Sequence, residues 1–211
     1  MLDEAAFLRQ IDRYPEDLAT LQVYADWLEE NTQDDRAGFL RLQMQILALM
    51  PRVRGLIGLS RQLVERARRL PRDWVSLVSR PRLVDTCWAG HDSDGSFYVF
   101  RYLPGGTLNY TSPSGKFQNG TWIQVGNQVL MEMNRHYADY EGFVCGSFIR
   151  GTATNILGNH WRWRVNQTAD PELCDPGDAI MTIFAEHQSR RRSRSRRATR
   201  ARRHRRSGPG R

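Results

Sequence analysis

Trp161-Arg162-Trp163-Arg164-Val165 is the stretch that decides the fold of this sequence. Its side chains alternate between large apolar groups and positively charged ones. Successive side chains of an extended strand point to opposite faces, so the two tryptophans and the valine share one face and the two arginines share the other. The stretch therefore predicts a β-strand with one buried face and one solvated face.

The residues before this strand show the same period of two. From Leu83 onward, short strand-like runs alternate with turn signals about every eight to twelve residues. The turn signals are Asp94-Gly95, Pro104-Gly105-Gly106, Ser114-Gly115, Gly126-Asn127 and Gly158-Asn159. The other strand-like runs are Phe97-Tyr98-Val99-Phe100, Thr121-Trp122-Ile123, Val129-Leu130-Met131 and Phe148-Ile149. About eight strands in meander order favour a closed barrel over an open sheet, because closure removes exposed edges. We expect an antiparallel up-and-down β-barrel-like domain over residues 83–188, with residues 179–185 as an extra strand or helix that plugs it.

Residues 1–51 have a helical period instead. Pro15-Glu16-Asp17 is typical of a helix start, because proline tolerates the first turn and carboxylates favour the positive end of the helix dipole. Apolar residues recur at helical spacing around Phe7 to Ile11, Leu18 to Leu28, and Phe39 to Leu49, before Pro51. The segment therefore predicts a small helical bundle, and the whole chain is of the α+β class.

Residues 52–82 form a basic segment between these two parts. Apolar residues from Leu56 to Leu70 predict a fourth helix, with arginines outside its apolar stripe. We interpret residues 52–82 as a basic helical connector. Its final part, residues 71–82, has two prolines and few apolar residues, which suggests an exposed linker.

The net charge of +8 conceals a strong asymmetry along the chain. Residues 1–51 hold 4 arginines against 10 acidic residues, whereas residues 189–211 hold 12 arginines and no acidic residue. The latter segment is too polar to bury and too uniform in charge to fold alone, so we expect a disordered tail. Guanidinium groups bind phosphate through paired hydrogen bonds, which predicts non-specific binding of nucleic acid or other polyanions. The arginines concerned are Arg190, Arg191, Arg192, Arg194, Arg196, Arg197, Arg200, Arg202, Arg203, Arg205 and Arg206.

Two alternatives remain open for this tail. It can contact an acidic protein surface, including the acidic residues of the segment 1–51 of the same chain. It can also reflect compositional drift, because Lys116 is the only lysine of the chain and low-complexity composition does not establish a role.

Cys87, Cys145 and Cys174 are an odd and widely spaced set. A disulfide framework usually has an even number of cysteines, and a zinc site usually has close cysteine pairs. We therefore expect reduced thiols. The acidic start Met1-Leu2-Asp3-Glu4 is unlike a signal peptide, and no apolar run is long enough for a membrane helix, which favours a cytoplasmic protein.

The stretch Glu4 to Leu49 resembles the repeat-companion domain, which occurs at the N-termini of many paralogous proteins in some large-genome bacteria. The motifs are Phe7-Leu8-Arg9, Leu21-Gln22-Val23-Tyr24-Ala25-Asp26-Trp27-Leu28-Glu29-Glu30 and Gly38-Phe39-Leu40-Arg41-Leu42-Gln43. The resemblance covers under a quarter of the chain and implies an adaptor module without an activity of its own. The loop Asn31-Thr32-Gln33-Asp34-Asp35 lacks the glycine expected there.

Residues 83–167 resemble the calycin barrels, which include lipocalins, fatty-acid carriers and avidins. Gly120-Thr121-Trp122 matches their Gly-x-Trp motif, and Gly151-Thr152-Ala153-Thr154-Asn155 with Trp161-Arg162-Trp163 is similar to small bacterial domains of this type. The resemblance implies binding of a small apolar ligand or a peptide. Lipocalins place Gly-x-Trp on their first strand, whereas here it falls near the middle, so no ligand residue is carried over.

Motifs for metal binding and catalysis are missing. The five histidines have no partner at the spacing that puts two ligands on one face. His91-Asp92-Ser93-Asp94-Gly95 resembles the start of a calcium loop, but a third acid is missing and Leu103 stands where glutamate is expected. No Gly-x-Ser-x-Gly or comparable nucleophile motif occurs. We expect a non-enzymatic protein without metal or cofactor.

A ligand site in the barrel is a weaker hypothesis. Its residues are Trp122, Tyr137, Tyr140, Trp161 and Trp163. The tryptophans either cage a ligand or fill the core of a barrel that has no cavity. The tyrosines, with Asp139 and Glu141, either line a polar ligand site or belong to a strand edge with solvated acids.

Two functional hypotheses follow from the sequence. The first is a binding or adaptor protein whose tail binds nucleic acid or other polyanions. The second is a calycin-type protein whose barrel binds a small ligand or a peptide.

Overall fold

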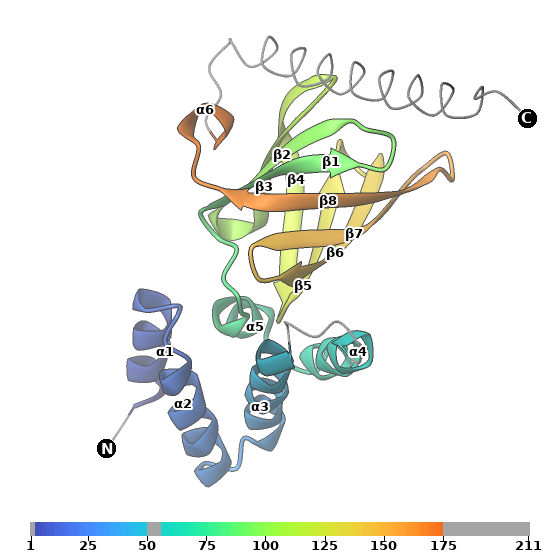
Figure 1. Cartoon of the computed structure of the whole chain (residues 1–211). Coiled ribbons are helices and arrows are strands. Elements are labelled where there is room, and N and C mark those ends of the chain that lie inside the picture. The colour runs from blue at the N-terminus through green and yellow to red at the C-terminus, as the bar shows by residue number, and fades with distance from the viewer. Residues whose placement is uncertain (1–2, 50–55, 175–211) are drawn as a thin grey trace, which may run out of the picture.

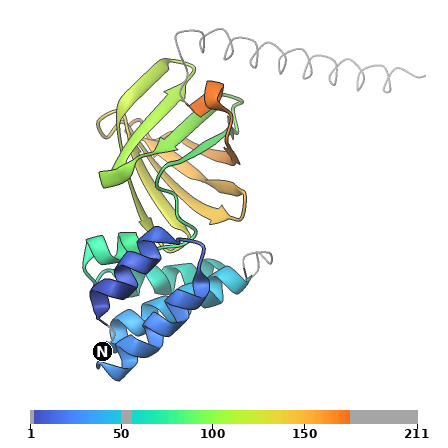
Figure 2. The same cartoon turned by 90° about the vertical axis from the view of Figure 1, so that its left-hand side faces the viewer.

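The computed structural model describes residues 3–49 and 56–174, and places a group of helices beneath one end of a closed β-barrel (Figures 1 and 2). The helices of this group are α1 (Glu4–Arg13), α2 (Leu18–Glu30), α3 (Asp34–Leu49), α4 (Leu56–Ala67) and α5 (Arg72–Val78), whereas the short α6 (Pro171–Cys174) follows the last strand and lies against the barrel. The strands are β1 (Thr86–Asp92), β2 (Phe97–Tyr102), β3 (Thr107–Ser112), β4 (Gly115–Val125), β5 (Gln128–Met133), β6 (Ala138–Cys145), β7 (Phe148–Asn155) and β8 (His160–Thr168), with the 3-10 turn η1 (Pro104–Gly106) after β2. The predicted α+β order of helical bundle and up-and-down barrel is confirmed. The predicted tail 189–211 and the segment 179–185 lie outside the described residues.

Side-chain caps fix where the first helices begin. Asp17 is the N-cap of α2, and its Oδ1 accepts hydrogen bonds from the backbone N–H groups of Ala19 and Thr20 at 3.1 and 3.3 Å. The hydroxyl of Thr20 donates to the same carboxylate, and these bonds lower the pKa of Asp17. The sequence suggested that Pro15 lies in the first turn of a helix, but Pro15 precedes α2 and its N-cap Asp17. Within the described residues, no helix combines the length and the apolar character needed to cross a membrane.

The helices pack around one hydrophobic core. Tyr24 of α2 and Phe39 of α3 are fully buried in it, together with Leu63 of α4. Trp74 of α5 completes the core, because its indole N–H donates to the hydroxyl of Tyr24 at 2.9 Å and its ring meets Phe39 edge-on. Helices α4 and α5, read from the sequence as a connector, therefore belong to the helical core.

A buried polar seam joins α3 to the segment after α5. The side chain of Gln43 is 1% exposed, donates to the carbonyl of Val78 at 2.7 Å and accepts from the N–H of Arg80 at 3.0 Å. Ser79 and Arg80 are buried as well. Residues 71–82, interpreted from the sequence as a linker, therefore pack against the helices, with Trp74, Val75 and residues 78–80 buried.

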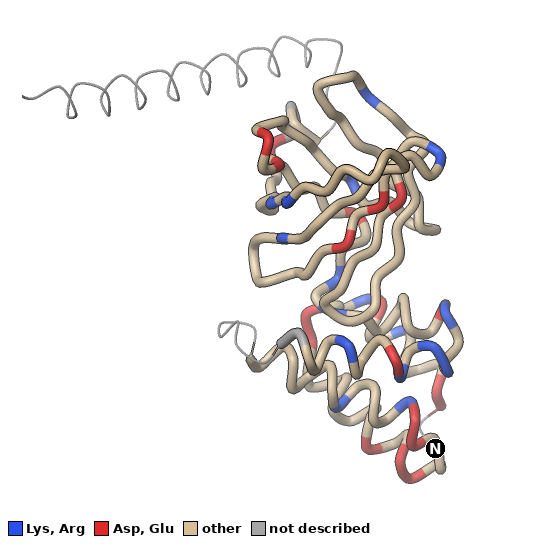
Figure 3. The backbone as a smooth tube through the Cα atoms, turned by 90° about the vertical axis from the view of Figure 1, so that its right-hand side faces the viewer, with Lys and Arg blue, Asp and Glu red and all other residues tan. Residues whose placement is uncertain are grey.

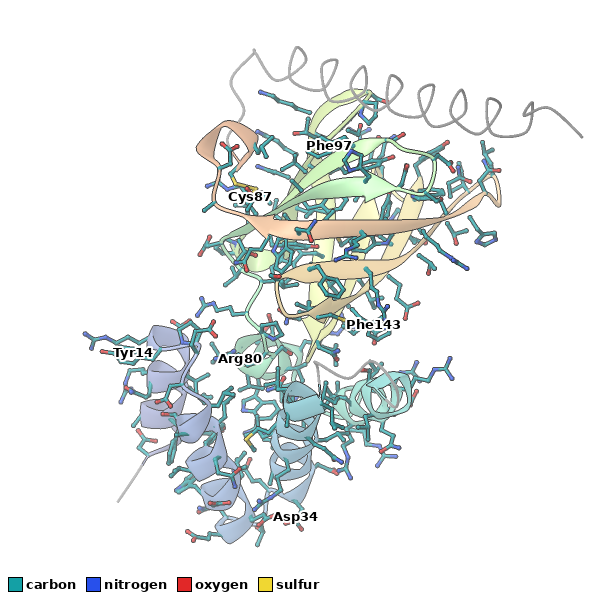
Figure 4. All side chains as sticks on the ribbon, in the orientation of Figure 1. Tyr14, Asp34, Arg80, Cys87, Phe97 and Phe143 are labelled. Atoms are coloured by element: carbon teal, nitrogen blue, oxygen red, sulfur yellow. A yellow bond between two sulfur atoms is a disulfide. The ribbon has the colours of Figure 1, made fainter. Side chains whose placement is uncertain are left out.

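Arg80 lies at the centre of this seam (Figure 4). Its guanidinium donates to the carbonyls of Pro15, Leu77 and Ile11 at 2.6, 2.9 and 3.0 Å. Burial lowers the pKa of Arg80 to about 10, because the charged form loses its hydration. The side chain ties α1 to α5.

The tip of the β4–β5 hairpin connects the barrel to the helices. The N–H of Gly126 is 2.9 Å from the Ser79 hydroxyl oxygen, and the hydroxyl of Ser60 donates to the Asn127 side chain at 3.1 Å. Gln124 of β4 donates to the carbonyl of Pro81 at 2.5 Å. These buried bonds fix the orientation of the barrel on the helical core.

The eight strands pair in sequence order, and β1 closes the barrel by pairing with β8. As the alternation in β8 predicted, Trp163 and Val165 are buried while Arg162 and Arg164 are exposed. Gly120-Thr121-Trp122 lies on the fourth strand, which agrees with its position near the middle of the barrel sequence.

A disulfide joins Cys87 of β1 to Cys174 of α6, whose Cα atoms are 5.7 Å apart (Figure 4). It covers the outer side of β1 and β2, where Phe97 and Val99 pack with Leu173. The expectation of reduced thiols is wrong for this pair, because the fold brings together cysteines that are 87 positions apart. Cys145 is free and buried. Disulfides persist mainly in oxidising compartments, so the thiol argument for a cytoplasmic protein no longer holds.

We predict that Gly126→Ala destabilises the protein more than Gly146→Ala. Both glycines have a positive φ, +57° and +65°, so both substitutions strain the backbone by about 1 kcal/mol. A Cβ at Gly126 also lies 2.1 Å from Cδ2 of the buried Leu63, whereas nothing lies within 4 Å of one at Gly146. Urea unfolding should give an additional loss of about 1–3 kcal/mol for Gly126→Ala. Equal losses would show that the hairpin tip does not pack on α4.

Candidate functional site

The structure separates the five residues of the predicted ligand site. Trp122, Tyr140 and Trp163 point into the barrel and are buried, and Trp161 packs against them while partly buried. Tyr137 is 39% exposed in the turn between β5 and β6. Four of the five therefore contribute to the barrel interior, and Tyr137 lies outside it.

Five aromatic rings form a contact cluster inside the barrel. The ring centroid of Tyr140 lies 6.5 Å from that of Tyr98, 6.0 Å from Phe100, 5.6 Å from Trp161 and 5.7 Å from Trp163, all edge-on. Such edge-to-face pairs favour a fixed packing of the rings.

Gly142 of β6 makes room for this cluster. A Cβ at Gly142 would lie 2.6 Å from Cζ2 of Trp163, so only glycine lets the indole reach the strand. Trp122 lies in a separate contact, 5.1 Å from Tyr102, and its indole N–H donates to the carbonyl of Leu103 at 3.0 Å.

These side chains fill the barrel interior. Large buried residues come from every strand: Trp88, Phe100, Tyr102, Leu108, Tyr110, Trp122, Val129, Met131, Met133, Tyr140, Val144, Ile149, Trp163 and Val165. An eight-stranded barrel is just wide enough to be filled by its own side chains. The inward residues therefore pack the barrel core, and the side chains open to a partner lie on the outer face.

An open groove of about 520 Å³ lies on the outer face of β4 to β7. Its exposed apolar residues are Ile123, 60% exposed, and Leu130, 38% exposed. Its lining residues are Thr121, Trp122, Ile123, Leu130, Met131, Glu132, Asp139, Tyr140, Glu141, Thr152 and Thr154. Asp139 and Glu141, which the sequence placed beside a polar site, do line this groove, but they point away from the barrel interior.

Strand register explains how these side chains come together. Thr121, Glu132, Asp139 and Thr154 are successive partners across β4, β5, β6 and β7. Two residues away, Ile123, Leu130, Glu141 and Thr152 form a second row on the same outer face. Each row is a ladder of neighbouring side chains about 5 Å apart. The groove thus places two aliphatic side chains beside three carboxylates.

The sequence interpretation missed Thr121, Ile123, Leu130 and Glu132. Ile123 and Leu130 belong to runs that were read only as apolar strands. Ile123 follows the inward Trp122, so the period of two already assigned it to the outer face. That signal was available, whereas the pairing of Glu132 with Asp139 required the register.

The carboxylates of the groove lack an arginine or lysine partner within residues 3–49 and 56–174. Glu132 contacts the exposed His136 at 2.9 Å, and Glu141 accepts a hydrogen bond from the amide of Gln128 at 2.5 Å. Figure 3 shows acidic positions grouped on neighbouring strands of the barrel. Like charges directly opposite each other, as in Glu132 and Asp139, are unfavourable across strands. Asp139 and Glu141 therefore offer negative charge to a cation.

The histidines and loop acids that the sequence singled out have structural partners where the structure describes them. Across the described ranges, no set of three or more His, Cys, Asp or Glu side chains is placed to hold a metal ion. His160 shares a hydrogen bond of 2.8 Å with Thr154, which accounts for one exposed histidine. Asp92, from the calcium-like loop, accepts the N–H of Ser96 at 2.8 Å, as an acid does in a hairpin turn.

No protein-family model matches the chain, and no curated protein or solved structure matches it. The resemblances to the repeat-companion domain and to the calycins therefore rest on the sequence motifs quoted above. The eight-stranded antiparallel barrel is compatible with a calycin-like fold.

We predict that alkaline pH destabilises the folded protein through its buried tyrosines. Burial, with Asp92 beside it, raises the pKa of Tyr98 to about 12, and burial raises the pKa of Tyr102 and Tyr140 as well. Unfolded tyrosines ionise near pH 10. Their contribution to stability is complete below pH 10 and is lost as pH rises towards the folded pKa.

The measurement is the free energy of urea unfolding at pH 9, 10 and 11. It should fall above pH 10, and Tyr98→Phe should reduce this slope. Arg80 acts in the opposite direction, since its lowered pKa makes the folded state relatively more stable as pH rises above about 10. Tyr137→Phe is the matched control because its ring lies outside the barrel. A slope that Tyr98→Phe leaves unchanged contradicts the assignment.

Proposed function

We propose that this protein is a non-enzymatic binding protein whose outer groove on β4 to β7 holds a basic peptide segment. The observation that carries the proposal is the groove itself, with Ile123 and Leu130 beside Glu132, Asp139 and Glu141. A second candidate binding segment is the arginine-rich tail, residues 189–211.

The groove chemistry suits arginine and lysine side chains. Each has an apolar stem and a cationic head, so the stem covers aliphatic surface while the head meets a carboxylate. The closed barrel has no free strand edge, so the partner binds through side chains and not by strand addition. Charge complementarity of this kind favours specificity and fast association more than high affinity.

The alternative is a calycin-type protein that binds a small apolar ligand or a peptide. The eight-stranded barrel supports this proposal at the level of fold. The filled interior favours the peptide on the outer groove over a ligand enclosed among Trp122, Tyr140 and Trp163.

An adaptor role agrees with the proposed kinship of residues 4–49 to the repeat-companion domain. Four residues of its central motif are fully buried in the helical core, namely Leu21, Tyr24, Ala25 and Leu28. Packing of the helical core therefore explains these motif residues without any catalytic activity. The helical core in turn supports the barrel through Ser60 and Ser79, which bond to the tip of the β4–β5 hairpin.

The tail provides the second candidate function. Its 12 arginines without an acidic residue favour binding to RNA or DNA through phosphate groups. Aromatic residues are absent between these arginines, so base stacking and sequence readout contribute little.

We predict that fragment 1–188 binds an arginine-rich peptide through the groove. This fragment retains both hydrophobic cores, the closed barrel and the disulfide. The triple variant Glu132→Gln, Asp139→Asn and Glu141→Gln should weaken binding by about tenfold at low salt, since three charge contacts are lost. Fluorescence anisotropy of the labelled peptide measures the dissociation constant.

The matched control is Glu30→Gln, Glu65→Gln and Asp94→Asn, which removes the same charge from exposed positions outside the groove. Equal weakening by both triple variants would assign the binding to net charge and sink the groove proposal. Ile123→Ser with Leu130→Ser tests the apolar part, and should weaken the same peptide without a change in charge.

We predict that the tail gives the full chain its affinity for nucleic acid. If roughly six phosphate contacts form, the affinity falls by about a thousandfold between 50 and 200 mM salt. Filter binding with one RNA and one DNA compares the full chain, fragment 1–188 and a tail peptide. Retained affinity in fragment 1–188, or none in the peptide, contradicts this prediction.

A further inference from the structure

The acidic surfaces of the molecule differ in how far the fold already neutralises them. In the helical domain, Arg36 pairs with Glu4 at 2.7 Å and Arg82 pairs with Asp12 at 2.8 Å. Arg41 contacts both Asp26 and Glu29, at 3.0 and 2.6 Å. Much of the charge of the segment 1–51 is therefore compensated by the chain's own arginines.

Further acids of this domain stabilise helix ends. Asp3 and Asp17 are N-caps, and Asp34 and Asp35 lie in the first turn of α3, where the helix dipole favours negative charge. The groove acids Asp139 and Glu141 have no arginine or lysine partner in the described part of the chain. The groove is thus the better acceptor for an arginine-rich segment, although the helical domain has more acids.

We infer that the chain's own tail, residues 189–206, docks in the groove on β4 to β7 and competes there with basic partners and with polyanions. This inference rests on the proposed function of the groove and names its regulation. Two observations favour the tail as the occupant of the groove. It carries 11 arginines that complement the groove acids, and it belongs to the same chain.

The attachment point of the tail makes this contact possible. The described chain ends at Cys174, which the disulfide holds against the outer side of β1 and β2. In an eight-stranded barrel this side is opposite β5 and β6. The barrel is about 50 Å around, given strand spacing and tilt, so the groove lies about 25 Å away along its surface. Residues 175–189 span up to about 50 Å when extended, which is long enough.

Tethering makes even a weak contact effective. A segment joined to its site by a short flexible linker has an effective concentration of about 1 mM. If the isolated segment binds with a dissociation constant of about 0.1 mM, the tethered tail lowers the apparent affinity for a competing peptide about tenfold. A polyanion must likewise displace the tail from the groove before it can bind all the arginines of the tail.

The test uses the full chain and three variants of it. The tail variant replaces Arg190, Arg191, Arg192, Arg194, Arg196 and Arg197 by serine; the groove variant and its matched control are the two triple variants described above. The first probe is a labelled peptide with the sequence of residues 189–206. It should bind the tail variant about tenfold more tightly than it binds the full chain.

The second probe is a single-stranded RNA at low salt. The groove variant should bind it about fivefold to tenfold more tightly than the matched control does, since only the former releases the tail. Equal RNA affinities for these two variants overturn the inference. An effect that grows with protein concentration also overturns it, because the tail then docks on a second copy.

The peptide result separates failure of the inference from failure of the proposed function. Equal, measurable binding to the full chain and to the tail variant leaves the groove as a peptide site and refutes docking of the tail. Absence of binding to the tail variant refutes the groove as a peptide site, and the inference with it.

Discussion

The guanidinium of Arg80 is buried between the helices and donates to main-chain carbonyls of Pro15, Leu77 and Ile11. A buried charge without a carboxylate is costly unless its donors are satisfied, so these carbonyls must stay where they are. The same residue offers its backbone N–H to Gln43, which also holds Val78. The hydroxyl oxygen of the neighbouring Ser79 accepts a hydrogen bond from the N–H of Gly126, at the tip of the β4–β5 hairpin. The position of the barrel, and hence of its groove, depends on this one network.

Sequence patterns predicted the strands and turns that depend on adjacent residues. They did not predict contacts between residues far apart in the sequence. The alternation in β8 and the Gly126-Asn127 turn were recognised because each needs only a few adjacent residues. The β5–β6 turn uses positive φ at Asn134, Arg135 and His136, none of them glycine, so it has no strong sequence signal. The Cys87–Cys174 bond spans 87 positions, and the burial of Arg80 depends on carbonyls from α1. The groove required the register of four strands.

The number of acidic residues in a segment of the sequence does not give the number of unpaired acidic side chains on its surface. Segment 1–51 is the more acidic part by composition, yet its arginines and helix ends compensate many of its acids. The β4–β7 face has fewer carboxylates, but alternation sends Glu132, Asp139 and Glu141 outward together. The outward Arg162 and Arg164 lie on β8, and Arg150 of β7 does not line the groove. Binding by charge depends on this local imbalance, because exposed charges more than a Debye length apart are screened.

The disulfide has a further consequence that is mechanical. Cys87 lies at the start of β1 and Cys174 lies after β8, so the bond makes a covalent ring that contains the whole barrel. The helical domain and the tail leave this ring from the same point. Tension applied between a partner held by the helices and a partner held by the tail passes through the two sulfur atoms. This covalent path bypasses strands β2 to β8, which form the barrel wall and its groove.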